Sequence, residues 1–145
     1  GGKLPSTRQW DKAAGRFEDN PLAGPYDPNW DPAKDKDRTQ IALNRPQGPL
    51  PVGTASKDRS PFGCRDMAGN GFEWTRNLAA PAGQEVPFSG VNEETRVLLR
   101  GQTYQPSEDE PAGYPPFRFS ALKPEPSGSY TRPQADIGFR VVLEP

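Results

Sequence analysis

The sequence has no histidine and a single cysteine, Cys64, among its 145 residues. Without histidine, the chain cannot supply a Ser-His-Asp or Cys-His catalytic group, a His-ligated zinc or iron, or the commonest general base. One thiol cannot form an internal disulfide or a cysteine-rich metal site. These absences exclude several large classes of enzyme and metal site for this chain, and they leave its redox compartment undetermined.

An excess of one charge and long apolar runs are lacking too. The chain carries 18 basic and 19 acidic residues, with a net charge of -1. Nucleic-acid binding requires an excess and clustering of lysine and arginine, which this balance does not provide. No apolar run approaches the roughly 18 residues of a membrane span. We therefore expect no nucleic-acid partner and no membrane span in this chain.

Proline and glycine are abundant instead, with 19 and 15 residues, and hydrophobic residues make up only 32%. Such a composition is typical of low-complexity or disordered chains. Aromatic residues nevertheless reach 10%, whereas disordered chains are poor in them. We interpret the chain as an ordered, loop-rich domain in which proline excludes long helices.

Residues 4–17 contain the clearest helix pattern. Ser6 is a candidate N-cap and Gln9 follows three residues later, which is the spacing of a capping box. Gly15 is a candidate C-cap that would end the helix early. The helical spacing places four apolar residues on one face: Trp10, Ala13, Ala14 and Phe17.

Short extended segments are expected further along the chain. Residues 60–78 are rich in glycine turns, and an extended conformation after them would point Phe72 and Trp74 to the same side. The apolar runs Arg96–Arg100 and Gly138–Leu143 are bounded by breakers, as buried strands are. The remaining proline-rich stretches predict irregular surface structure.

Four segments of this chain occur in a recognisable order: KLPS at residues 3–6 with the helix after it, GCRDMAGNGFEWT at 63–75, RVLLRGQTY at 96–104 and GFR at 138–140. Together they resemble the motifs of the formylglycine-generating enzyme family, also called the sulfatase-modifying factor family. The resemblance implies an α+β fold of the C-type-lectin type. The first motif lies mid-domain in that family. Residues 1–145 are therefore expected to be the C-terminal portion of one such domain, with its N-terminal portion missing from this chain.

The resemblance also indicates where catalytic groups would lie. Oxidases of the family convert a substrate cysteine using molecular oxygen, copper and two cysteines placed five positions apart. A pair of soft thiolates is the natural ligand set for Cu(I), but the matching positions here are Pro106 and Pro111. The one thiol, Cys64, lies where the family has a leucine, which predicts a small buried hydrophobe. We therefore expect no copper, and enzymatic activity is not the favoured hypothesis.

A structural calcium site is a further implication of the resemblance. The family holds calcium in the segment that matches residues 66–73, which implies ligands from Asp66 and Glu73 side chains and from Gly69 and Gly71 carbonyls. Hard oxygen ligands on a flexible turn suit this ion.

The alternative to calcium is a purely structural role for the same carboxylates. Asp66 would then cap a turn, and Glu73 would pair with an arginine such as Arg76 or Arg100. A second calcium site of the family would fall near residues 29–30 and Asn44. We do not expect that site to be occupied, because an asparagine replaces its acidic ligand.

Two arginines and three tryptophans are candidate binding residues with simpler structural interpretations. We expect Arg100 and Arg140 to be buried and satisfied by backbone carbonyls or Asp136 rather than to bind an anion. Tryptophans can stack on a sugar or a peptide, but core packing is the favoured interpretation here because aliphatic residues are few. These tryptophans are Trp10, Trp30 and Trp74.

Three functional hypotheses follow. The favoured one is a non-catalytic binding or sensor module of a larger bacterial protein, such as a serine/threonine protein kinase, and it would lie outside the cytoplasm if it is a sensor. Residues 19–50 and 105–136 would present its surface to a protein, peptide or carbohydrate ligand. The alternatives are a family enzyme with altered chemistry and a purely structural, calcium-stabilised domain.

Overall fold

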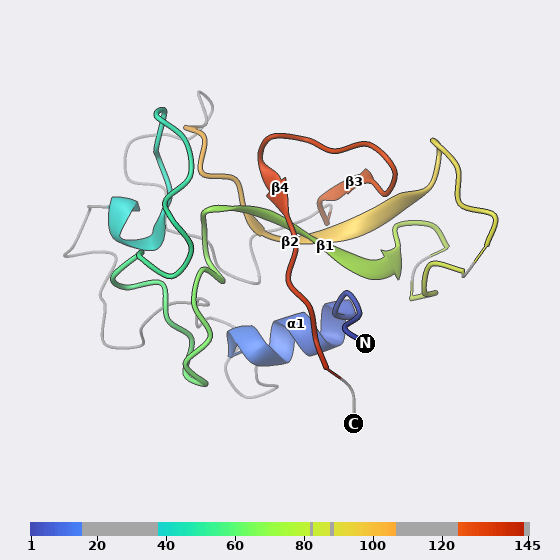
Figure 1. Cartoon of the computed structure of the whole chain (residues 1–145), viewed down its shortest axis with the longest axis horizontal. Coiled ribbons are helices and arrows are strands. Elements are labelled where there is room, and N and C mark those ends of the chain that lie inside the picture. The colour runs from blue at the N-terminus through green and yellow to red at the C-terminus, as the bar shows by residue number, and fades with distance from the viewer. Residues whose placement is uncertain (16–37, 82, 88, 107–124, 144–145) are drawn as a thin grey trace.

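The computed structural model describes residues 1–15, 38–81, 83–87, 89–106 and 125–143. Within these ranges the chain forms one α-helix, one short 3-10 helix and a four-stranded sheet, which is an α+β combination (Figure 1). The elements are α1 (Thr7–Ala14), η1 (Arg38–Ile41), β1 (Gly71–Leu78), β2 (Arg96–Gln102), β3 (Ser127–Ser129) and β4 (Ile137–Gly138). No helix in this part of the chain has the length and apolar character needed to cross a bilayer.

Helix α1 begins with the predicted capping box. Ser6 accepts a hydrogen bond from the Gln9 backbone N–H, and the Gln9 side chain accepts one from the Ser6 N–H. The helix ends at Gly15, whose φ of 96° is left-handed. A Cβ added there would lie 2.7 Å from Cδ of Pro61. Glycine is therefore required at this position, and the helix is shorter than residues 4–17. Phe17 lies outside the described residues.

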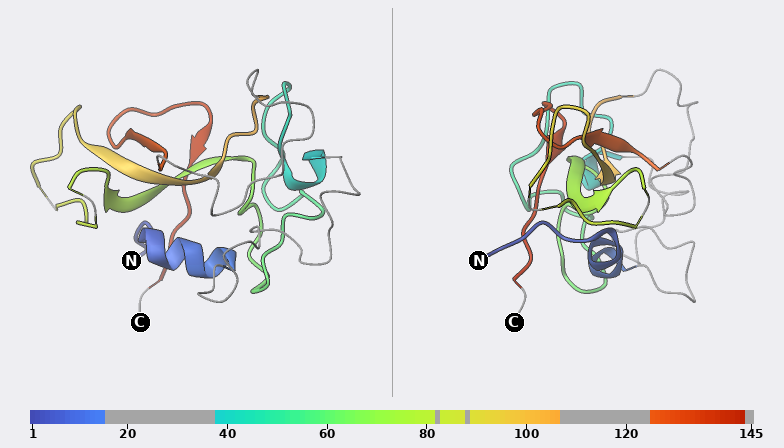
Figure 2. Two further views of the ribbon diagram at one scale, coloured as in Figure 1. Left: turned by 180° about the vertical axis from the view of Figure 1, so that it is seen from behind. Right: turned by 90° about the vertical axis from the view of Figure 1, so that its right-hand side faces the viewer.

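The helix lies along one face of the sheet and covers it (Figure 2). Trp10, Ala14 and Met67 form a fully buried cluster, which confirms the predicted core role of Trp10. Trp74 is only half-buried, and its indole N–H donates to the Ser129 carbonyl at 3.1 Å. Trp30 lies outside the described residues.

Strands β1 and β2 form the antiparallel centre of the sheet, in the order β3-β2-β1-β4. Their register places Glu73 opposite Arg100 and Trp74 opposite Leu99. The predicted strand Arg96–Arg100 is confirmed and continues to Gln102. Strand β4 is parallel to β1. The last strand of the chain therefore lies beside the strand that follows the glycine-rich residues 63–71.

An ion pair between Arg100 and Asp11 joins the helix to the sheet. Arg100 Nε lies 2.7 Å from Asp11 Oδ1, with both side chains almost fully buried. Arg100 Nη1 also donates to the Leu99 carbonyl, and Nη2 pairs with the half-exposed Glu125. The predicted burial of Arg100 is confirmed. Its predicted bond to a backbone carbonyl is confirmed at Leu99, and its carboxylate partners among the described residues are Asp11 and Glu125 rather than the alternative, Asp136.

The prediction of a buried strand over Gly138–Leu143 is wrong. Strand β4 ends at Gly138, and beyond it Phe139, Val141 and Leu143 are 67%, 59% and 82% exposed. The intervening residue Arg140 is half-buried and paired with Glu73. The apolar run therefore turns its charged residue inward and its largest apolar side chains outward.

Candidate functional site

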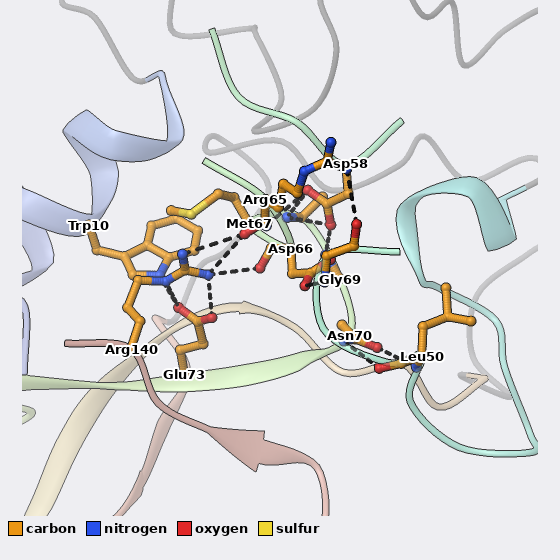
Figure 3. A network of polar contacts seen from close by, with 12 residues as sticks. Trp10, Leu50, Asp58, Arg65, Asp66, Met67, Gly69, Asn70, Glu73 and Arg140 are labelled. Carbon is orange, nitrogen blue, oxygen red and sulfur yellow. Dashed lines mark hydrogen bonds and ion pairs between the residues drawn. The ribbon is translucent and has the colours of Figure 1, made fainter. Parts of the chain in front are cut away.

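The glycine-rich turn that precedes β1 is organised around Asp58, which is fully buried. Its Oδ1 accepts from the Met67 and Ala68 N–H groups at 2.9 Å, and its Oδ2 accepts from Ala68 and Gly69 at 3.0 Å (Figure 3). One carboxylate thus satisfies three consecutive backbone donors. Sequence reasoning missed this residue, because Asp58 stands outside the recognisable motif and no spacing marks it.

Burial raises the pKa of Asp58 from 3.8 to about 6, against the lowering effect of the Gly69, Ala68 and Met67 hydrogen bonds. The negative charge of Asp66 adds to the rise. The folded protein therefore binds a proton at Asp58 more readily than the unfolded chain does. This linkage makes the contribution of Asp58 to stability largest at acid pH.

We expect the contribution of Asp58 to the free energy of unfolding to fall as pH rises from about 4 to about 6. The rise in pKa of about two units corresponds to about 3 kcal/mol. This proton-linked part of the stability is fully present below the unfolded pKa and is lost above the folded one. Carboxyl carbon NMR of Asp58 measures the folded pKa directly, and urea unfolding across the same pH range gives the energy. A carboxyl that titrates near 4 in the folded protein would contradict this prediction.

The side chains of Asp66 and Asn70 form hydrogen bonds with the backbone of residues 50–53 and so connect that loop to the glycine-rich turn. The Asp66 Oδ2 accepts from the Gly53 N–H at 2.5 Å. The Asn70 side chain pairs with both backbone groups of Leu50, at 2.6 and 3.0 Å. Both Asp66 and Asn70 have positive φ, 55° and 69°. The second Asp66 oxygen, Oδ1, is buried and has no hydrogen-bond partner among the described residues.

Glu73 on β1 is held by Arg140 and Trp10. The Arg140 Nε and Nη2 donate to the two carboxylate oxygens of Glu73, and the Trp10 indole N–H donates to Oε2. Arg140 Nη2 also donates to the Asp66 carbonyl at 3.0 Å (Figure 3). Burial opposes the Arg140 charge, but the hydrogen bond and charge of Glu73 outweigh it, so the pKa of Arg140 is raised.

The predicted pairing of Glu73 with an arginine is confirmed, and the arginine is Arg140 rather than either of the two named as examples. Arg76 pairs with Glu85 at 2.8 Å, and Arg100 pairs with Asp11. Arg140 is also satisfied by backbone carbonyls, as predicted.

The proposed calcium ligands fit only in part. Asp66 offers a buried carboxylate oxygen that has no partner in the described part of the chain, which suits a hard cation. Both oxygens of Glu73, in contrast, are engaged by Arg140. Gly69 packs against backbone, since a Cβ there would lie 2.2 Å from the Ile41 carbonyl oxygen. No group of three or more Cys, Asp or Glu side chains is placed to hold a metal ion in the described part of the chain.

The other predicted site residues make none of the hydrogen bonds described above, or they lie outside the described residues. Cys64 is half-buried and packs against the cluster of Trp10, Ala14 and Met67. Asn44 is exposed, with φ of 55°. Pro106 is exposed. Pro111 and residues 29–30 lie outside the described residues.

The motifs that lie far apart in the sequence converge on this network. The helix supplies Trp10, the glycine-rich segment supplies Glu73, and the final motif supplies Arg140 (Figure 3). The family model of the sulfatase-modifying factor enzyme 1-like domain matches residues 1–145. The chain belongs to this family. A search among curated proteins gives no match.

Membership in the sulfatase-modifying factor family confirms the resemblance drawn from the four motifs, and the match covers the whole chain. It implies a C-type-lectin-like fold, with which one α-helix and a four-stranded sheet in the described residues agree. The family motifs have a structural role in this chain, because Trp10 and Arg140 from two of them both donate to the carboxylate of Glu73 from a third.

Proposed function

We propose that this chain is a non-catalytic binding module of the sulfatase-modifying factor family. The proposal rests on the number and the positions of the cysteines in this chain. The oxidases of the family need two cysteines, and this chain has Pro106 and Pro111 at the matching positions. Its only thiol, Cys64, packs beside the apolar cluster of Trp10, Ala14 and Met67.

The module would bind through loops carried on a fixed scaffold. Such loops are the usual place for binding residues. Asp66 and Asn70 support this arrangement, because they attach residues 50–53 to the turn that leads into β1. We propose a protein, peptide or carbohydrate ligand. We further propose that the module belongs to a larger bacterial protein such as a serine/threonine protein kinase, with the module outside the cytoplasm. The sequence of the parent reading frame tests this last point.

We expect no oxygen consumption when the protein is supplied with Cu(I) and a cysteine-containing sulfatase peptide. A single thiol cannot provide the two-thiolate Cu(I) site of the oxidases. An oxygen electrode measures turnover, and isothermal titration measures copper binding. The Cys64→Ser variant is the matched control, and it should behave like the unaltered protein. Turnover that persists in Cys64→Ser would instead establish an enzyme with altered chemistry.

We also propose calcium as a stabilising ion at the turn formed by residues 66–73. The buried Asp66 Oδ1, which lacks a hydrogen-bond partner within the ranges that the structure describes, supports this proposal. Asp66 would provide that oxygen, the Gly69 and Gly71 carbonyls would add to it, and Glu73 would join by exchanging Arg140 for the metal. In this arrangement calcium would stabilise the turn without taking part in a reaction, as in the structural-domain hypothesis.

Calcium at about 100 times its Kd should raise the melting temperature by about 5–10 °C, because binding to the folded state alone adds about 2.7 kcal/mol. Chelator should reverse this. Asp66→Asn keeps an acceptor for the Gly53 N–H but removes the charge, so it should abolish the response. Glu94→Gln, at an exposed position, is the control that should retain it. Equal melting temperatures with calcium and with chelator would rule out the ion.

A further inference from the structure

Asn70 and Gly71 are neighbours at the end of the glycine-rich turn, where β1 begins. In this sequence Asn70 is the only asparagine that is followed by glycine. An asparagine before glycine can lose ammonia without an enzyme, because glycine has no side chain to shield its backbone nitrogen from the asparagine amide. The dipeptide is therefore a candidate site of covalent modification.

The fold requires both residues of this dipeptide. The φ of Asn70 is 69°, in the left-handed region that asparagine tolerates better than most residues. Gly71 has a φ of 130°, and a Cβ added to it would lie 3.0 Å from the Asp136 carbonyl oxygen. A side chain at position 71, which would shield the backbone nitrogen, therefore does not fit.

The Asn70 side chain is engaged by Leu50 in the folded protein. Its Oδ1 accepts from the Leu50 N–H at 2.6 Å, and its Nδ2 donates to the Leu50 carbonyl at 3.0 Å (Figure 3). Two bonds to one residue fix the orientation of the planar amide. To react, the Asn70 Cγ must rotate to meet the Gly71 nitrogen, which breaks these bonds. The Leu50 pairing therefore opposes the reaction, which requires a local opening of the structure.

We infer that Asn70–Gly71 is a self-modification site that the Leu50 pairing holds in check, and that its modification loosens the attachment of residues 50–53 to the turn. The Gly71 nitrogen attacks the Asn70 Cγ and forms a succinimide ring. The Cγ–Nδ2 bond breaks, and Nδ2 leaves as ammonia with the proton lost from the Gly71 N–H. Water then opens the ring and leaves aspartate or isoaspartate at position 70. This reaction does not rest on the proposed function, because it needs only these two residues and water.

Either product weakens the connection between the turn and residues 50–53. A carboxylate accepts hydrogen bonds but donates none, so the Leu50 carbonyl loses its donor and faces a negative charge. Isoaspartate also lengthens the backbone by one carbon just before β1. The turn already holds the carboxylates of Asp58 and Asp66, and like charges disfavour one another. Modification of Asn70 therefore acts as a slow, irreversible switch on this loop.

Variants at Leu50 test the restraint, because the pairing uses the Leu50 backbone and not its side chain. Leu50→Pro removes the N–H that donates to Asn70, and Leu50→Ala, which keeps it, is the matched control. The full chain is incubated in calcium-free buffer at mildly alkaline pH, and mass spectrometry of the peptide that contains Asn70 measures conversion of amide to acid. We expect Leu50→Pro to convert at least about tenfold faster than Leu50→Ala, which corresponds to an opening free energy lower by about 1.4 kcal/mol.

Three other asparagines serve as internal controls in the same samples. Asn44, Asn77 and Asn92 precede residues with long side chains, and they should stay unmodified while Asn70 converts. If Leu50→Pro does not fold, the unaltered protein in sub-denaturing urea takes its place. The rate of conversion should then rise in proportion to hydrogen exchange of the Leu50 amide.

The modified protein tests the consequence for the loop. It carries an additional negative charge, so ion exchange separates it from the unmodified protein. Its Leu50 amide should exchange hydrogen at least about tenfold faster than that of the unmodified protein. Absence of conversion in Leu50→Pro, equal conversion in Leu50→Pro and Leu50→Ala, or unchanged exchange at Leu50 after modification would each overturn the inference.

Discussion

Replacement of Asp58 by alanine is expected to lower the free energy of unfolding by about 3 kcal/mol at pH 7. The substitution leaves the Met67, Ala68 and Gly69 N–H groups without their acceptor, and each buried unpaired donor costs about 1–3 kcal/mol. Removal of the buried charge relieves about 3 kcal/mol, as judged from its raised pKa. The lost hydrogen bonds outweigh this relief, because they are bonds to a charged acceptor and are lost together.

Urea unfolding of the variant and the unaltered protein measures the Asp58 effect. Asp58→Asn is the informative intermediate, because it keeps one acceptor oxygen and should cost about half as much. Glu94→Ala, at an exposed position, should change stability by less than about 0.5 kcal/mol. A loss in Asp58→Ala no larger than that of Glu94→Ala would show that the turn does not depend on this carboxylate.

Replacement of Asp11 by asparagine should destabilise the protein by about 3 kcal/mol. The change leaves the guanidinium of Arg100 buried, and among the described residues only the half-exposed Glu125 remains as a charged partner. Breaking one side of a buried ion pair generally costs about 3–5 kcal/mol, whereas replacing the whole pair costs less. The loss should therefore exceed that of an ordinary surface ion pair by a wide margin.

A double-mutant cycle tests the interpretation of the Asp11–Arg100 pair. The double variant Asp11→Asn/Arg100→Met should be more stable than the sum of the single losses predicts, because neither charge remains unpaired. Glu125→Gln removes the outer partner of the same arginine and should cost no more than about 1 kcal/mol. Strictly additive losses in the cycle would show that the two side chains are not coupled.

The local features of this protein were predictable because short patterns encode them. The capping box of Ser6 and Gln9 and the helix stop at Gly15 depend on neighbours within a few residues. The strand Arg96–Arg100 follows from a compact apolar run between breakers. The family follows from four motifs in order, which the match over residues 1–145 confirms.

The pairing of buried charges could not be predicted in the same way. Arg100 and Asp11 are 89 residues apart, and Arg140 and Glu73 are 67 apart. Several arginines and carboxylates would satisfy any rule based on residue type alone. The choice of partner depends on which strands lie side by side, and in particular on the parallel placement of β4 beside β1.

The candidate site also combines residues that the sequence identifies with a residue that only the folded structure reveals. The motif identified Asp66, Gly69 and Glu73, but the acceptor that organises the turn, Asp58, lies outside the motif. Its role arises only when the chain folds back so that three consecutive N–H groups face one carboxylate. Burial removes water from those donors, and an unpaired buried donor is costly. The need for such an acceptor therefore exists only in the folded state.

The sequence by itself determined the family, the α+β character, the capped helix and the absence of a paired thiol site, because these depend on residue identity and on local spacing. The tertiary structure alone decided that Asp58 holds the turn, that Arg140 neutralises Glu73, and that the run after Gly138 exposes its apolar side chains. Hydrophobicity measures how strongly a side chain favours burial, but it does not say which face of a strand the rest of the chain covers. In residues 139–143 the covered face carries the side chains of Arg140 and Val142.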